Sequence, residues 1–97
     1  MRHVRPCVYI MASGVRGTSY VGVTSNFEVR AAQHRLALVA GFTSKYRIDT
    51  LVWFEAHGTM ESAILREKSV KAWKRAWKLA LVENANPEWR DLFPDLA

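Results

Sequence analysis

The sequence contains a single cysteine, three prolines and five glycines among 97 residues. One cysteine excludes an internal disulfide and a zinc site built from several cysteines. No apolar run approaches the ~20 residues that a membrane-spanning helix needs, so we expect no membrane segment. The basic start is followed by neither a long apolar segment nor a small-residue cleavage site, and we therefore expect a cytoplasmic protein.

Several catalytic signatures are also missing. Gly14 and Gly17 lack the spacing and the following Lys-Ser/Thr of a phosphate-binding loop. No serine lies on a nucleophile elbow, and His3, His34 and His57 do not have the spacing of metal ligands. These absences argue against nucleotide hydrolysis by a P-loop, serine hydrolysis and a histidine metal centre.

What is present is the composition of a small globular domain with an excess of positive charge. The apolar fraction is 49%, the charged fraction is 24% and the net charge is +5. A chain of this length can bury one modest core, so we expect one domain over residues 1–97. The charge favours a polyanionic partner, of which nucleic acid is the commonest.

Two β-like runs, residues 7–12 and 19–24, are separated by a turn-rich segment and predict an antiparallel hairpin. If Ala12 pairs with Gly17, Tyr9 lies opposite Tyr20 and both phenols share one face. A one-residue slip or a bulge would separate them, and the sequence does not decide the register. Gly22, inside the second run, indicates a bulge or a close backbone approach.

A first helix is predicted from residue 26 to about residue 39, because Ser25 and Glu28 form a capping-box pattern. Arg30 and His34 are four residues apart and would project from the same face of this helix. The polar pair is equally consistent with a solvated helix face.

The pattern over residues 50–56 predicts a third strand, and Thr59 is placed to cap a second helix. Glu67 lies on the apolar face of that helix, where the spacing calls for a hydrophobic residue. A simpler interpretation is a surface ion pair with Lys71, four residues further on. A further helical segment is predicted to end near residue 84, and the tail that follows is predicted to pack back on the body as a short helix or turn.

From residue 66 to residue 78, six cations alternate with Trp73 and Trp77. This pattern suits nucleic-acid binding, and it also suits an amphipathic helix that buries its indoles. A loop at residues 41–47 adds basic and aromatic groups. The candidate nucleic-acid contacts are Lys45, Tyr46, Lys68, Lys71, Lys74 and Arg75.

Tyrosine, arginine, histidine and glutamate together could hydrolyse a phosphodiester bond. A guanidinium grips the phosphate, a carboxylate holds Mg²⁺ with its waters, and a tyrosine near a cation, or a histidine, relays the proton. The same tyrosines could equally be ordinary residues at the edge of the core. The candidates for this chemistry are Tyr9, Tyr20, Arg30, His34 and Glu67.

The order of these residues resembles the GIY-YIG nuclease family, in particular the small stand-alone bacterial subfamily related to the nuclease domain of the excision-repair endonuclease. Val8-Tyr9-Ile10 is similar to the first motif and Tyr20-Val21-Gly22 to the second. Arg30, His34 and Glu67 follow in the family order, and the resemblance covers about residues 6–93. Two positions depart from the pattern: Cys7 replaces a glycine, and Val23 stands where repair enzymes often carry a lysine.

The resemblance implies an α/β (α+β) fold with a three-stranded antiparallel sheet flanked by helices. It implies that Tyr9 or Tyr20 accepts a proton, Arg30 clamps the phosphate, His34 assists and Glu67 binds Mg²⁺ or Mn²⁺. Since the lysine can help to ionise the tyrosine, its absence lets His34 compete as the base.

Two functions remain open at this stage. The first is an endonuclease that cuts DNA, including branched or damaged DNA, in a repair-related role. The second is a nucleic-acid-binding module with little or no cutting. The sequence does not distinguish DNA from RNA and does not indicate an oligomeric state.

Overall fold

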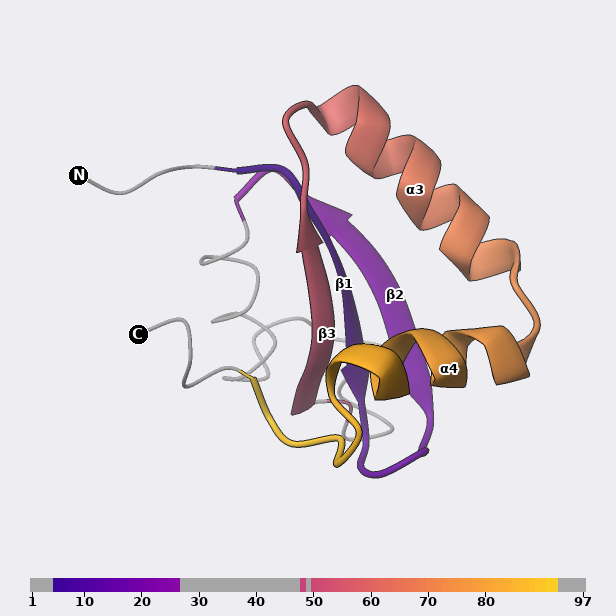
Figure 1. Ribbon diagram of the computed structural model, residues 1–97. Helices are drawn as coiled ribbons and strands as arrows, with labels where there is room; N and C mark the ends of the chain where they lie inside the picture. Colours follow the sequence, from indigo (N-terminus) through magenta and orange to yellow (C-terminus); the bar gives the residue numbers. More distant parts are fainter. Residues whose placement is uncertain (1–4, 27–47, 49, 93–97) are drawn as a thin grey trace.

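The computed structural model describes residues 5–26, 48 and 50–92 of the chain. Within these residues, the strands form one antiparallel sheet in the order β2-β1-β3, with two helices packed against it (Figure 1). This confirms the predicted α+β class and the three-stranded sheet. The elements are β1 (Cys7–Ala12), β2 (Ser19–Thr24), β3 (Thr50–Ala56), α3 (Met60–Ala72) and α4 (Arg75–Ala85).

The central strand β1 is buried along its whole length, which explains why its sequence is apolar throughout. Its side chains alternate between two clusters. Val8 and Ile10 belong to the larger apolar cluster, whereas Tyr9 and Met11 belong to a second cluster with Ile48. Because successive side chains in a strand point to opposite faces, the tyrosine lies on the face opposite that larger cluster.

The hairpin between β1 and β2 closes as predicted, through a local turn. The backbone N–H of Ser13 donates to the Thr18 carbonyl at 2.9 Å, and the Thr18 N–H donates to the Ser13 hydroxyl at 3.0 Å. Arg75, the first residue of α4, donates to the carbonyls of Arg16 and Gly17 at 2.5 and 3.3 Å. The turn is therefore held by a helix that lies about 60 residues further along the chain.

Strand β3 carries a bulge that the sequence does not reveal. Ile10 pairs with Trp53 and Met11 pairs with Leu51, so Val52 has no partner in this register. The side-chain amide of Asn86 donates to the Val52 carbonyl at 3.1 Å. The bulged residue of β3 is thus bonded to the residue that caps the end of α4.

Helix α3 begins at Met60 and is capped where the sequence predicts, by Thr59, whose hydroxyl accepts the Ser62 N–H at 3.1 Å. It ends at Ala72, and its C-cap Trp73 and the next residue, Lys74, adopt extended backbone before α4 begins. In Figure 1, α3 runs beside the β2 edge of the sheet and α4 crosses one face. The predicted further helical segment is α4, which ends at Ala85.

The tail after α4 turns back onto the body, as predicted. Trp89 is buried despite a positive φ of 57°, and its indole N–H donates to Glu83 at 2.8 Å. The Leu92 N–H donates to the Leu51 carbonyl at 2.8 Å, along the outer edge of β3. The predicted helix at residues 26–39 lies outside the described residues.

Candidate active site

The two strand tyrosines lie on the same face of the sheet. Ala12 pairs with Ser19, so Tyr9 is opposite Gly22 and Tyr20 is opposite Met11. This register differs by two residues from the Ala12–Gly17 pairing considered above, and an even shift preserves the face of every side chain. The ring centroids of Tyr9 and Tyr20 are 6.4 Å apart at an interplanar angle of 39°.

Gly22 provides the space in which the two rings meet. A Cβ atom at this position would lie 2.5 Å from the Tyr9 hydroxyl oxygen and 2.9 Å from a ring carbon of Tyr20. Any larger residue would therefore displace one of the rings. This confirms that the glycine marks a close approach, here between backbone and side chains.

Glu67 lies on the buried face of α3, at the helical spacing of Ala63 and Val70. The residue is only 8% exposed, against 0% for both of these neighbours. A carboxylate at such a position loses hydration and requires a compensating partner. The partner is Lys71, whose Nζ lies 2.8 Å from Glu67 Oε2.

Lys71 also connects Glu67 to the tyrosines. The hydrogen bond with Glu67 raises the pKa of Lys71 above its ordinary value, against an opposing effect of desolvation, and Coulombic interactions with Glu67 and Tyr20 add to the rise. Lys71 is therefore ion-paired with Glu67 and interacts electrostatically with Tyr20, whose ring lies beside that of Tyr9.

Val23, the position of the missing lysine, packs against the larger apolar cluster instead. It lies on the face of β2 opposite Tyr20, since the two are three residues apart. Within the described residues, α3 supplies a cation that interacts with Tyr20, namely Lys71. The i, i+4 spacing of Glu67 and Lys71 signalled the ion pair, but the sequence did not show that Lys71 approaches a tyrosine.

The donor set fits a hydrated divalent cation. Mg²⁺ is commonly held through one or two carboxylates while keeping several waters and taking oxygens from a phosphate substrate. Glu67 supplies one such carboxylate, partly shielded from solvent. Within the described residues, no three side chains of His, Cys, Asp or Glu converge to form a complete metal cage.

The remaining predicted residues fall into two groups. Of the basic residues, Lys68 and Lys74 are exposed, whereas Arg75 also bonds the hairpin turn. The predicted roles of all of these in nucleic-acid binding stay predictions. Four predicted site residues lie outside the described residues: Arg30, His34, Lys45 and Tyr46.

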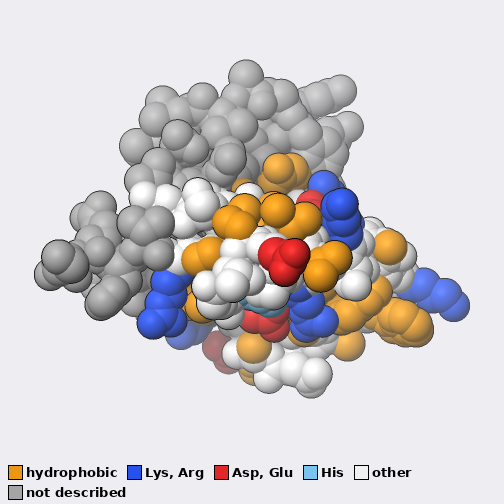
Figure 2. Space-filling view, turned by 90° about the horizontal axis from the view of Figure 1, so that it is seen from above, with side chains coloured by type: hydrophobic (Ala, Val, Ile, Leu, Met, Phe, Trp, Pro, Cys, Tyr) orange, Lys and Arg blue, Asp and Glu red, His pale blue; other side chains and the backbone are white. Residues whose placement is uncertain are grey.

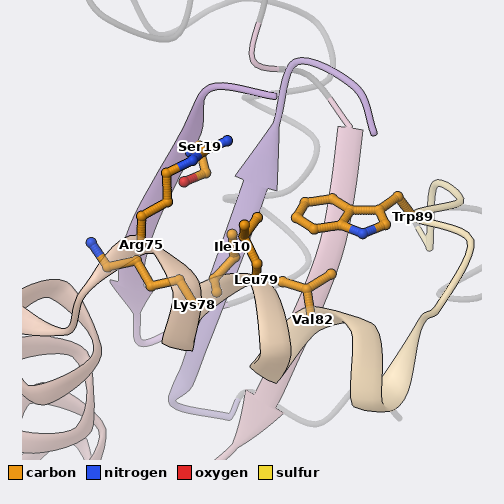
Figure 3. Close-up of a pocket in the computed structure, with 7 residues that line it drawn as sticks. All are labelled: Ile10, Ser19, Arg75, Lys78, Leu79, Val82 and Trp89. Carbon is orange, nitrogen blue, oxygen red and sulfur yellow. The ribbon is translucent and has the colours of Figure 1, made fainter. Parts of the chain in front are cut away.

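A cavity of about 110 Å³ lies on the other face of the sheet, beneath α4. The indole of Trp89 lies at one end, and the cationic side chains of Arg75 and Lys78 lie at the other (Figure 3). Its floor includes Ile10, which points away from the tyrosines. This cavity is therefore separate from the site that contains Tyr9, Tyr20 and Glu67.

Comparison with known proteins identifies the domain. Residues 5–80 match the family described as the GIY-YIG catalytic domain. The chain belongs to the GIY-YIG family. The match spans both tyrosine strands, Glu67 and Lys71, and it establishes a nuclease-type domain whose substrate class is nucleic acid.

A curated relative of this GIY-YIG domain is a UPF0213 protein of Staphylococcus haemolyticus. It is 34% identical over 64 residues, which cover 66% of this chain and 78% of the relative. No solved structure matches the chain significantly. Among the helices of the described residues, none is long and apolar enough to cross a membrane.

Proposed function

We propose that this GIY-YIG domain is a metal-dependent endonuclease that hydrolyses phosphodiester bonds in DNA, with branched or damaged DNA as a repair-related substrate. The observation that carries the proposal is the ion pair of buried Glu67 with Lys71, a cation that interacts electrostatically with Tyr20, together with the two tyrosine rings that lie side by side. A core that serves only stability does not require a buried carboxylate near two phenols. In this proposal the carboxylate supplies the metal ligand and one of the phenols supplies the proton acceptor that the reaction requires.

In this proposal, Tyr20 or Tyr9 accepts the proton of the attacking water. Lys71 supplies a positive charge that interacts with Tyr20. Arg30 grips the non-bridging phosphate oxygens as a planar fork, and His34 assists proton transfer or phosphate contact.

Glu67 would hold Mg²⁺ or Mn²⁺. A bound divalent cation polarises the phosphate and stabilises the charge that develops during displacement. Among the described residues, Glu67 Oε2 is paired with Lys71.

The direct test compares Glu67→Gln with Glu61→Gln, an exposed acid on the same helix. Purified proteins are incubated with plasmid, flap and branched DNA in the presence of Mg²⁺ or Mn²⁺. We expect Glu67→Gln to lower the cleavage rate by about 100-fold or more, because a neutral amide is a poor ligand for a hard cation. Glu61→Gln should cleave normally.

Cleavage that survives in both Glu67→Gln and Arg30→Ala would contradict the proposal. Isothermal titration calorimetry with Mn²⁺ measures the affinity of the protein for the metal and does not depend on DNA cleavage. Binding of Mn²⁺ to the unaltered chain should weaken in Glu67→Gln and stay unchanged in Glu61→Gln.

A second function is favoured by the same ion pair. Because Lys71 already compensates Glu67, the site is electrostatically satisfied without a metal. The domain could then be a nucleic-acid-binding module that cuts little or not at all. A binder should tolerate Glu67→Gln with no change in affinity, and its binding should weaken steeply as salt is raised.

A further inference from the structure

The corner between α3 and α4 exposes a large aromatic side chain. Trp77 is 57% exposed, although tryptophan buries more apolar surface than any other residue. Its ring meets Trp73 edge-on, with centroids 6.2 Å apart and an interplanar angle of 78°. Trp73 is itself packed against the larger apolar cluster, so it fixes one edge of Trp77 while much of the second indole faces solvent.

A cationic side chain lies close to the ring of each of these two tryptophans. The Arg66 guanidinium lies 5.3 Å from the Trp73 ring centroid, and Lys74 Nζ lies 6.0 Å from that of Trp77. Arg66 is held in place by Glu55, at 3.1 Å between Nε and Oε1. We call Arg66, Trp73, Lys74 and Trp77 the tryptophan corner.

The surface around the corner combines apolar area with positive charge. Figure 2 shows hydrophobic and basic side chains adjoining one another at the right-hand end of the described surface. A purely apolar patch would suit a protein partner, whereas an indole flanked by cations matches a base next to its phosphate. The net charge of +5 points in the same direction.

We propose that the tryptophan corner binds an unpaired nucleotide of a nucleic-acid strand, with the base stacked on Trp77 and the phosphate near Lys74. The inference rests on the proposed function in taking nucleic acid as the substrate, and it narrows that substrate to one with unpaired nucleotides. The corner follows directly after the helix that carries Glu67.

The test measures equilibrium binding without a divalent metal, so that it does not depend on cleavage. Fluorescence anisotropy of labelled oligo(dT) and of a duplex of equal length is followed with the full chain. Trp77→Ala should weaken oligo(dT) binding roughly 5- to 100-fold, the range expected for the loss of one stacked base. Affinity for the duplex should change less than 2-fold, as a rough bound on the loss of a side chain that pairs no phosphate.

Two variants control for folding and for general apolar surface. Trp77→Phe retains an aromatic face and should recover most of the affinity for oligo(dT). Leu65→Ala removes another exposed apolar side chain, 64% exposed on α3, and should bind oligo(dT) normally. Circular dichroism and light scattering of each variant check the fold and the oligomeric state.

Equal loss of oligo(dT) and duplex affinity in Trp77→Ala, or no loss of either, would overturn the inference. So would a change in oligomeric state with unchanged oligo(dT) binding, which would assign the corner to contact with a second copy. If no DNA is cleaved and Trp77 still governs oligo(dT) binding, the nuclease proposal fails and the inference stands. If DNA is cleaved and Trp77→Ala binds oligo(dT) normally, the reverse holds.

Discussion

The two faces of the sheet differ in the side chains that they bury, although they share the same three strands. The face beneath α4 is an apolar cluster that includes Ile10, Val52 and Val82. The opposite face carries the hydroxyls of Tyr9 and Tyr20, and a buried carboxylate on α3 is linked to Tyr20 through Lys71. The face beneath α4 buries mainly apolar side chains, whereas the tyrosine face also buries polar groups.

This difference predicts separable effects of substitution. Changes on the α4 face should alter stability and leave the chemistry of the folded molecule unchanged. Changes on the tyrosine face should alter the chemistry more than stability. Each prediction below tests one side of this comparison.

The largest effect is expected from removing the tyrosine hydroxyls. Tyr20→Phe or Tyr9→Phe should lower the rate of DNA cleavage by roughly 100-fold or more for whichever hydroxyl acts as proton acceptor, because general-base catalysis contributes about this much. Single-turnover cleavage assays at several pH values measure the rate. The variant with the larger loss, and with an altered pH profile, identifies the acceptor. Wild-type rates in both variants would remove the tyrosines from the mechanism.

A smaller effect, confined to stability, is expected beneath α4. Val82→Ala should lower the free energy of unfolding by about 2 kcal/mol, because two buried methyl groups are lost from a residue that is 1% exposed. Urea denaturation followed by circular dichroism measures this change. Val15→Ala, at a position that is 68% exposed in the hairpin turn, is the matched control and should change stability by less than about 0.5 kcal/mol. A loss of cleavage activity in folded Val82→Ala would contradict the prediction that the α4 face affects stability alone.

An effect that is absent at neutral pH concerns Cys7, the first residue of β1. Burial raises the pKa of its thiol from 9.0 to about 11. The folded state therefore holds the proton between pH 9 and 11 while the unfolded state releases it. Stability should fall as pH rises through this window, and no effect is expected at pH 7, where the thiol is protonated in both states.

Two measurements check the Cys7 prediction. Alkylation by iodoacetamide at pH 8 should be slow in the folded protein and fast in urea, since the thiolate is the reactive form. The pH dependence of unfolding between pH 9 and 11 should be shallower in Cys7→Ala than in the unaltered chain. Rapid alkylation of the folded chain would show that the thiol is accessible.

Local sequence signals predicted much of the fold. An uninterrupted apolar run marked β1, and β-branched and aromatic residues marked β3, and the predicted bounds of all three strands are those observed. Thr59 marked the start of α3 through its capping hydroxyl. The apolar spacing on α3 also singled out Glu67 as a buried carboxylate. These features depend on residues within a few positions of one another, so the sequence contains the information directly.

Long-range features were not predictable in the same way. Nothing near Val52 indicates the bulge, because its carbonyl is satisfied by Asn86, 34 residues away. Nothing near residues 16 and 17 indicates that Arg75 binds their carbonyls. Such bonds depend on where α4 crosses the sheet, which is decided by packing of the whole domain.

The sequence by itself determined which chemical groups the molecule carries: two strand tyrosines, a glutamate on an apolar helix face, and a net positive charge. The tertiary structure decided which of them meet. The register placed Gly22 against both phenol rings, and the position of α3 let Lys71 pair with Glu67 and interact electrostatically with Tyr20. Side-chain direction follows from local alternation, but contact across elements requires the packed domain.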